Sequence, residues 1–163
     1  MNQNIKDQEK WPFFQAYHDD VYILRHDFSK NVPLREPKEN RTYRLLNNSA
    51  KEIVVYKIDG GIINSDGVLK CDYGIYTEED LLVLVELKGA DLDHALDQIC
   101  STIKILLKQP KIKVKKLNAR VVLSKTRVPD MLFTKEKQLK QLLQKSYGGG
   151  NYIKKSRVLE DTI

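Results

Sequence analysis

Hydrophobic residues in the middle of the chain follow strand spacing first and helix spacing afterwards. The β-branched and aromatic segments at 52–58 and 68–76 each predict a strand, and polar turns precede a third strand at 81–87. This third segment is apolar at every position except Glu86, which is typical of a strand buried on both faces. Three strands joined in succession by polar turns predict an antiparallel meander.

Apolar residues then recur every three or four positions between 91 and 108, which predicts an amphipathic helix. Asp91 is suited to cap the start of this helix, and Pro110 to end it. A further strand is expected at 119–124, and together with strand 81–87 it predicts a parallel crossover. The apolar stripe of the helix consists of Leu92, Ala95, Leu96, Ile99, Ile103, Leu106 and Leu107.

The two ends of the chain carry weaker patterns. Residues 1–50 are expected to form an N-terminal extension with a short helix after Trp11–Pro12, a strand near 21–24 and aromatic side chains in a satellite core. Residues 51–127 are expected to form the core of a single domain. Residues 128–163 predict a second helix that ends at the glycines 148–150, followed by an edge strand or a loose end.

The composition, with 41% hydrophobic and 31% charged residues, fits a soluble globular protein. No apolar run is long enough for a membrane-spanning helix, and the polar N-terminus does not resemble a secretion signal, so a cytoplasmic location without membrane contact is expected. Cys71 and Cys100 lie in predicted elements and are expected to be reduced core thiols. No Cys/His pattern has zinc spacing.

The net charge of +6 is unevenly distributed along the chain. Residues 1–97 contain 12 basic and 18 acidic residues, a net charge of −6, whereas residues 98–163 contain 16 basic and 4 acidic residues, a net charge of +12. A one-sided basic half suits a polyanionic partner, and a solvated surface is the alternative.

Candidate chemistry lies at the end of strand 81–87. Residues two apart in a strand share a face, so Glu86 and Lys88 point the same way, and Asp72 can meet Glu86 across the strand pair if the register permits. Two carboxylates and the main-chain carbonyl of Leu87 would suit Mg²⁺, while Lys88 would orient water or neutralise charge on a phosphate. Alternatively, Glu86 and Lys88 form a surface ion pair of little energetic weight.

Asp72 followed by Glu86-Leu87-Lys88, on strands that precede a helix and another strand, resembles the PD-(D/E)XK nuclease superfamily over about residues 52–125. The resemblance implies an α/β fold with a restriction-endonuclease-like αβββαβ core, in which helices flank a mixed central sheet. It also implies Mg²⁺-dependent cleavage of phosphodiester bonds, with Mn²⁺ as a substitute, in restriction, defence, repair or junction resolution. By this resemblance Asp72, Glu86 and Lys88 would be the catalytic residues, with Asp72 and Glu86 binding the metal. Gln98 on the following helix would support the site.

The chain departs from the family pattern at two points. Cys71 stands where a proline often precedes the first acid, and no helix with a well-placed acid precedes the first core strand. Glu36, Glu39 and Glu52 are the candidates for an upstream acid that completes the site. Asp59 is a competing acid, but its Asp-Gly-Gly context assigns it to a turn.

The basic half is expected to contact phosphates near the candidate site. The expected partner is nucleic acid, with DNA favoured, and the small size suggests a homodimer or a subunit of a larger complex. Two other classes remain open: a catalytically silent nucleic-acid-binding module, and a protein-interaction subunit that uses the aromatic N-terminal segment. The candidate phosphate contacts are Lys111, Lys113, Lys115, Lys116, Lys125 and Arg127.

Overall fold

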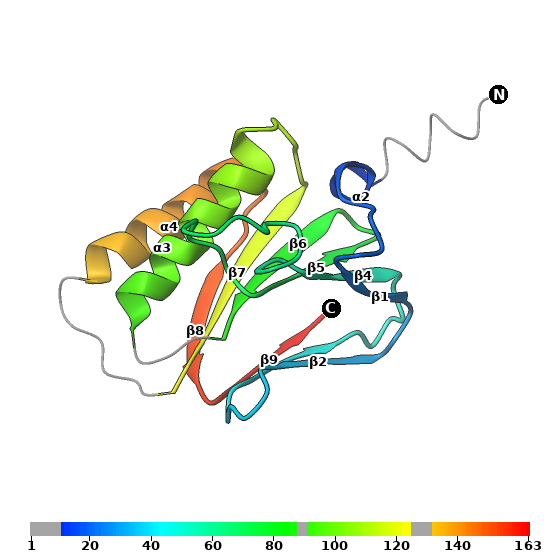
Figure 1. Cartoon of the computed structure of the whole chain (residues 1–163), viewed down its shortest axis with the longest axis horizontal. Helices are drawn as coiled ribbons and strands as arrows, with labels where there is room; N and C mark the ends of the chain where they lie inside the picture. The colour runs from blue at the N-terminus through cyan, green and yellow to red at the C-terminus, as the bar shows by residue number, and fades with distance from the viewer. Residues whose placement is uncertain (1–10, 88–90, 125–131) are drawn as a thin grey trace.

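The computed structural model describes residues 11–87, 91–124 and 132–163. They form a mixed α/β fold with two mixed sheets, of six and three strands, and three helices packed against them (Figure 1). The six-stranded sheet has the order β1-β4-β5-β6-β7-β8, and the three-stranded sheet has the order β2-β3-β9. Within the described residues, no helix is long and apolar enough to cross a membrane.

The expected antiparallel meander is confirmed as β4 (Ile53–Lys57), β5 (Tyr73–Thr77) and β6 (Leu81–Glu86). The expected strand at 68–76 is wrong in its first half, because residues 68–72 precede β5 and belong to no strand. Part of this segment hydrogen-bonds to helix side chains instead of a neighbouring strand: the Thr102 hydroxyl accepts from the Cys71 amide at 2.9 Å. Asp72 therefore lies one residue before the strand in which it was expected.

The parallel crossover is also confirmed. It runs from β6 through α3 (Leu92–Ile103) and the π-helical turn η1 (Lys104–Lys108) into β7 (Lys116–Leu123), which pairs parallel to β6. Asp91 caps α3 as expected, because its carboxylate accepts a hydrogen bond from the His94 amide at 3.0 Å. All seven residues of the predicted apolar stripe are buried.

The N-terminal residues belong to the main body of the fold. Strand β1 (Ile23–Asp27) extends the large sheet beside β4, and α2 (Pro12–Ala16) packs on the same core as α3. Phe13 is fully buried in this core, so the expected satellite core is wrong. The Tyr17 hydroxyl, just after α2, donates to the Leu106 carbonyl at 2.9 Å and ties this region to η1.

The C-terminal region contains the expected helix and two strands. Helix α4 (Leu132–Ser146) ends before Gly148 and Gly149, which have positive φ angles of 65° and 74°. Strand β8 (Tyr152–Ser156) then pairs parallel to β7 at the edge of the large sheet.

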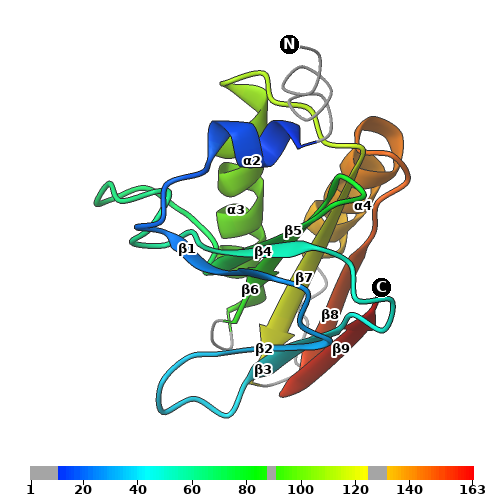
Figure 2. The same cartoon turned by 90° about the vertical axis from the view of Figure 1, so that its right-hand side faces the viewer.

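The second sheet lies on the face of the large sheet opposite α3 and α4 (Figure 2). It combines β2 (Asn31–Arg35), β3 (Thr42–Leu46) and β9 (Val158–Thr162), and β9 runs parallel to β3. Strand β2 is an edge strand, which accommodates Pro33. Strand β3 lies between β2 and β9 in this sheet.

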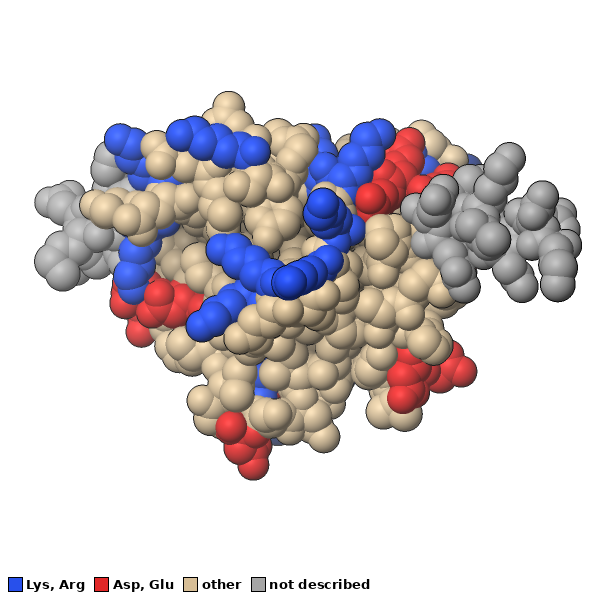
Figure 3. Space-filling model, turned by 90° about the horizontal axis from the view of Figure 1, so that it is seen from above, with Lys and Arg blue, Asp and Glu red and all other residues tan. Residues whose placement is uncertain are grey.

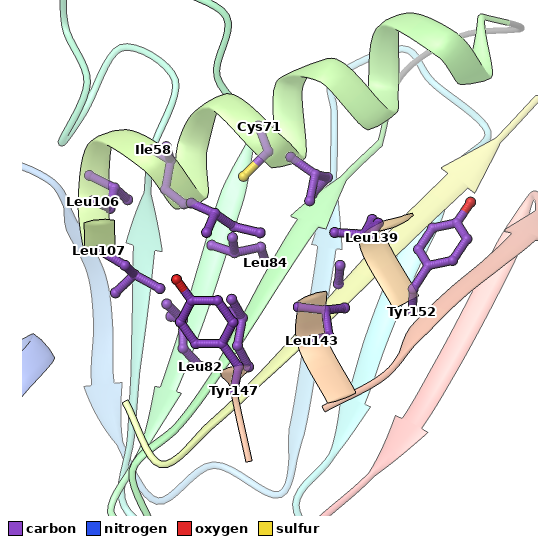
Figure 4. Close-up of a cluster of buried hydrophobic side chains, with 14 of the residues drawn as sticks. Ile58, Cys71, Leu82, Leu84, Leu106, Leu107, Leu139, Leu143, Tyr147 and Tyr152 are labelled. Atoms are coloured by element: carbon purple, nitrogen blue, oxygen red, sulfur yellow. The ribbon is translucent and has the colours of Figure 1, made fainter. Parts of the chain in front are cut away.

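Two hydrophobic cores result from this layered arrangement. The first lies between the helices and the large sheet, and Figure 4 shows its side chains, including Leu82, Leu84 and Cys71. The second lies between the two sheets and takes Val83 and Val85 from β6. Strand β6 is therefore buried on both faces, as its apolar run predicted.

The two cysteines differ in their surroundings. Cys71 is fully buried in the first core, as expected, whereas Cys100 is exposed. The expectation of two core thiols is therefore wrong for Cys100, because the apolar stripe of α3 turns the opposite side of the helix toward solvent.

Candidate functional site

Asp72 and Glu86 lie at the same end of the β5–β6 pair. Tyr73 is paired with Val85, so the antiparallel register places Asp72 opposite Glu86, immediately beyond the last pair of the ladder. A carboxylate oxygen of Asp72 accepts a hydrogen bond from the Leu87 amide at 2.8 Å. The predicted metal ligands Asp72, Glu86 and Leu87 therefore come together at one end of the large sheet.

Both carboxylates are buried, although acidic side chains are rarely fully buried in proteins. Glu86 is 0% exposed and Asp72 is 7% exposed. Both carboxylates affect the pKa of the nearby Cys71 thiol. Burial raises this pKa well above its usual value, and the charges of Glu86 and Asp72 raise it further. The strand end therefore concentrates negative charge in a region of low solvent access.

Side chains of α3 hold the segment that carries Asp72. The Gln98 amide donates to the Lys70 carbonyl at 2.9 Å, and the Thr102 hydroxyl, which accepts from the Cys71 amide, donates to the Gln98 carbonyl at 2.8 Å. Gln98 is buried, and the Lys70 carbonyl that it contacts lies two residues before Asp72. The observed contact positions the Asp72 segment, which is compatible with the supporting role expected for Gln98.

A cavity of about 680 Å³ opens beside this strand end. Asp72 and Leu87 line this cavity, whereas Glu86 does not. Four acidic residues and two basic residues share the lining, so the charge of the cavity is mainly acidic. Its charged residues are Glu36, Glu39, Asp59, Asp72, Arg41 and Lys57.

The structure separates the three candidate upstream acids. Glu36 and Glu39, in the connection between β2 and β3, line the cavity with Asp72. Glu36 accepts a hydrogen bond from the Tyr73 hydroxyl at 2.7 Å, which holds it next to the residue that follows Asp72. Glu52 lies instead at the far end of β4 and pairs with His26 at 2.8 Å. Acids from the second sheet, rather than from a helix, therefore accompany Asp72.

Asp59 also lines the cavity, although its assignment to a turn is confirmed. The following Gly60 has a φ of 70°, and the Gly61 amide donates to the Ile58 carbonyl at 3.1 Å. The Asp59 carboxylate pairs with Lys70 at 3.6 Å. A turn residue thus contributes charge near the site because this turn follows the same end of β4.

Four of the predicted phosphate contacts lie away from the carboxylates. Lys111, Lys113, Lys115 and Lys116 are exposed, but they precede or begin β7, where Lys116 pairs with Leu81. The five residue steps of β6 from Leu81 to Glu86 span about 17 Å. These lysines therefore belong to the opposite end of the sheet, and the expectation that they lie near the site is wrong. Figure 3 shows lysine and arginine side chains gathered on that end of the molecule.

The remaining predicted residues, Lys88, Lys125 and Arg127, lie outside the described residues. Ser124 is the last described residue after β7, and it lies at the same end of the sheet as Glu86 because β6 and β7 are parallel.

The donor chemistry of this strand end suits a hard cation, because carboxylate and carbonyl oxygens are the ligands that Mg²⁺ prefers. Within the described part of the chain, no group of three or more His, Cys, Asp and Glu side chains is arranged to hold a metal ion. The predicted set is of another kind, with two carboxylates and the main-chain carbonyl of Leu87. The whole chain significantly matches no protein-family model, no curated protein and no solved structure.

Sequence reasoning missed several residues that shape the cavity. Tyr73 holds Glu36, while Arg41 and Lys57 supply positive charge. Tyr73 directly follows Asp72, so its adjacency was a usable signal. Arg41 carried no such signal, because the connection between β2 and β3 reaches the cavity only through the second sheet.

Proposed function

We propose that this protein is a Mg²⁺-dependent nuclease that hydrolyses phosphodiester bonds in nucleic acid, with DNA as the favoured substrate. The observation that carries this proposal is the register of β5 and β6, which sets Asp72 opposite Glu86 at the edge of an acidic cavity. The order β4-β5-β6-α3-β7 supports the finer assignment to a restriction-endonuclease-like core.

Asp72, Glu86 and the Leu87 carbonyl would hold the metal ion. When bound, Mg²⁺ would polarise the phosphoryl oxygen and lower the pKa of a coordinated water molecule. The Leu87 amide fixes one oxygen of Asp72, so this carboxylate needs little reorganisation before it binds. Lys88 would orient the attacking water or neutralise the charge that develops on the phosphate.

A catalytically silent nucleic-acid-binding module is the second candidate. The exposed lysines at the opposite end of the sheet favour it, because they offer phosphate contacts that do not involve the carboxylates. The protein-interaction alternative stays open. Phe13 of the aromatic segment is buried in the core and Trp11 packs against Tyr76 at a ring separation of 5.4 Å, but Val21 and Phe28 of the same segment are 86% and 59% exposed.

A cleavage assay distinguishes the nuclease from the silent module. Purified protein is incubated with plasmid, linear duplex, single-stranded and branched DNA and with RNA, in Mg²⁺, Mn²⁺ or EDTA. We expect metal-dependent cleavage of at least one DNA substrate. Binding without cleavage of every substrate would favour the silent module.

Variants of the site residues then assign the chemistry. Asp72→Asn keeps an oxygen that accepts from the Leu87 amide but removes the charge, and Lys88→Ala removes the candidate catalytic cation. Both are expected to abolish cleavage while the far-ultraviolet circular dichroism spectrum and melting temperature stay close to those of the wild type. Asp66→Asn, at an exposed loop position, is the matched control and should cleave normally. Cleavage that survives in both site variants would refute the assignment.

A further inference from the structure

A second cavity, of about 570 Å³, adjoins the acidic one and has the opposite charge. The two cavities share Glu39 and Arg41, which belong to the connection between β2 and β3. Three of the six residues that line the second cavity are basic, and only one is acidic. The lining, named here the basic pocket, consists of Lys38, Glu39, Asn40, Arg41, Ser124 and Arg157.

Arg41 is the most buried cation of the basic pocket. The residue is only 7% exposed, and its Nε is buried with no hydrogen-bond partner among the described residues. Its guanidinium pairs with Glu39, whose own side chain is 43% exposed. This Nε has no contact with solvent, so a ligand in the pocket can meet Arg41 only through the other nitrogens of its guanidinium. Arg41 therefore places a largely buried positive charge in the wall of the pocket.

Two other basic residues of the pocket have backbone conformations that are costly for residues other than glycine. Lys38 has a φ of 64° and Arg157 a φ of 67°, both in the left-handed region. Strained residues of this kind concentrate at functional sites, where the surrounding structure holds them in place. Two of them in the lining of one small cavity point to a role in binding.

The main chain around Arg157 is rigidly held. Its amide donates to the Leu123 carbonyl at 2.8 Å, and its carbonyl accepts from the Thr42 amide at 2.8 Å. Arg157 thus joins the end of β7 in the large sheet to the start of β3 in the small one. These strands therefore fix the main chain on this side of the pocket.

We propose that the basic pocket binds a backbone phosphate of a nucleic-acid strand that passes the acidic cavity. Arginine provides paired N–H donors that match two phosphate oxygens, and Lys38 adds a third positive charge. The proposal rests on the nucleic-acid substrate of the proposed function but not on cleavage. In this proposal, the second sheet positions the nucleic-acid strand beside Asp72.

The test measures binding in EDTA, where metal-dependent cleavage is prevented. Fluorescence anisotropy gives the affinity of the full chain for a fluorescein-labelled 20-base-pair duplex over a range of KCl concentrations. The variants are Lys38→Gly and Arg157→Gly, alone and together, because glycine adopts a positive φ without strain and preserves the fold. Arg41→Lys tests the paired donors without changing the charge. Lys137→Ala, an exposed position on α4, is the matched charge control.

We expect the double variant to bind the duplex roughly tenfold more weakly, with a salt dependence reduced by about one to two phosphate contacts. Arg41→Lys should also weaken binding, and Lys137→Ala should not. Wild-type affinity and salt dependence in the double variant would overturn the proposal, as would a wild-type chain that binds no duplex. Failure of the proposed function has another signature: the pocket variants lose binding, yet the wild type cuts no substrate in Mg²⁺ or Mn²⁺.

Discussion

The contact that joins the two sheets gives a stability prediction whose size follows from the structure. Arg120 on β7 pairs through Nε with the Asp161 carboxylate on β9 at 2.6 Å, and the same oxygen accepts from the Tyr43 hydroxyl on β3 at 2.9 Å. The side chains of Arg120 and Asp161 are 4% and 16% exposed. Asp161→Ala removes both hydrogen bonds and takes away the carboxylate that pairs with the buried charge of Arg120.

Removing one partner of a buried ion pair costs about 3 to 5 kcal/mol. Arg120 Nη1 keeps hydrogen bonds to the Ala119 and Asn151 carbonyls, at 2.9 and 3.0 Å, which places the expected loss near the lower limit. We therefore expect Asp161→Ala to lower the free energy of unfolding by about 3 kcal/mol. For a chain of this length, that loss corresponds to a fall of about 10 °C in melting temperature.

Urea denaturation followed by circular dichroism measures this loss, and Glu160→Ala is the matched control. Glu160 neighbours Asp161 on β9 and pairs with Arg44 on β3 at 3.4 Å, but both of these side chains are substantially exposed. An exposed pair contributes less than about 1 kcal/mol. If Asp161→Ala cost no more than Glu160→Ala, the buried pair would not join the sheets as described.

Three further predictions concern pH, thiols and the lysine-rich end. Burial and the nearby Tyr22 raise the pKa of Tyr17 to about 12, whereas the pKa of an unfolded tyrosine is about 10. The free energy of unfolding should therefore fall as pH rises from about 10 to about 12. Urea denaturation at pH 9 and pH 11 measures this fall, and an equal free energy of unfolding at the two pH values would contradict it. A thiol reagent should modify Cys100 in the native protein but Cys71 only after unfolding, and Cys100→Ser should remove the native reaction. The four lysines at the opposite end of the sheet are Lys111, Lys113, Lys115 and Lys116. Replacing them by glutamine should weaken binding of a 30-base-pair duplex more than that of a 10-base-pair duplex, as measured by fluorescence anisotropy. Equal losses for the two duplexes would indicate that the lysines lie near the carboxylates.

The meander and the crossover were predictable because their signals are local. The apolar run of β6 and the spacing of the α3 stripe each depend on a single segment and its own burial. The cap at Asp91 is a signal of the same kind, since it involves residues three positions apart. These elements bring Asp72 and Glu86 to one end of the sheet.

The second sheet could not be predicted from local signals. Tyr43 and Asp161, which join it, are 118 positions apart, and a strand of five residues does not specify so distant a partner. Both Glu36 and the basic pocket depend on this sheet. The sequence therefore offered Glu36 and Glu39 only as candidates beside Glu52, and it gave no signal for the basic pocket.

The position of the lysines was wrong for a topological reason. A helix that follows β6 returns the chain to the opposite end of the sheet before β7 begins, because β6 and β7 are parallel. Residues 111–116 therefore cannot lie beside Glu86. The predicted crossover already contained this information, but the lysines were grouped with the site by their charge alone.

The most direct test of the central claim is a Mn²⁺ titration followed by electron paramagnetic resonance. The account predicts a Mn²⁺ site in the wild type whose affinity falls at least about tenfold in both Asp72→Asn and Glu86→Gln. Asp66→Asn should retain wild-type affinity. Mn²⁺ binding of wild-type strength in Glu86→Gln would contradict the account, because it would assign the cation to other acids of the cavity and leave Glu86 with no part in holding it.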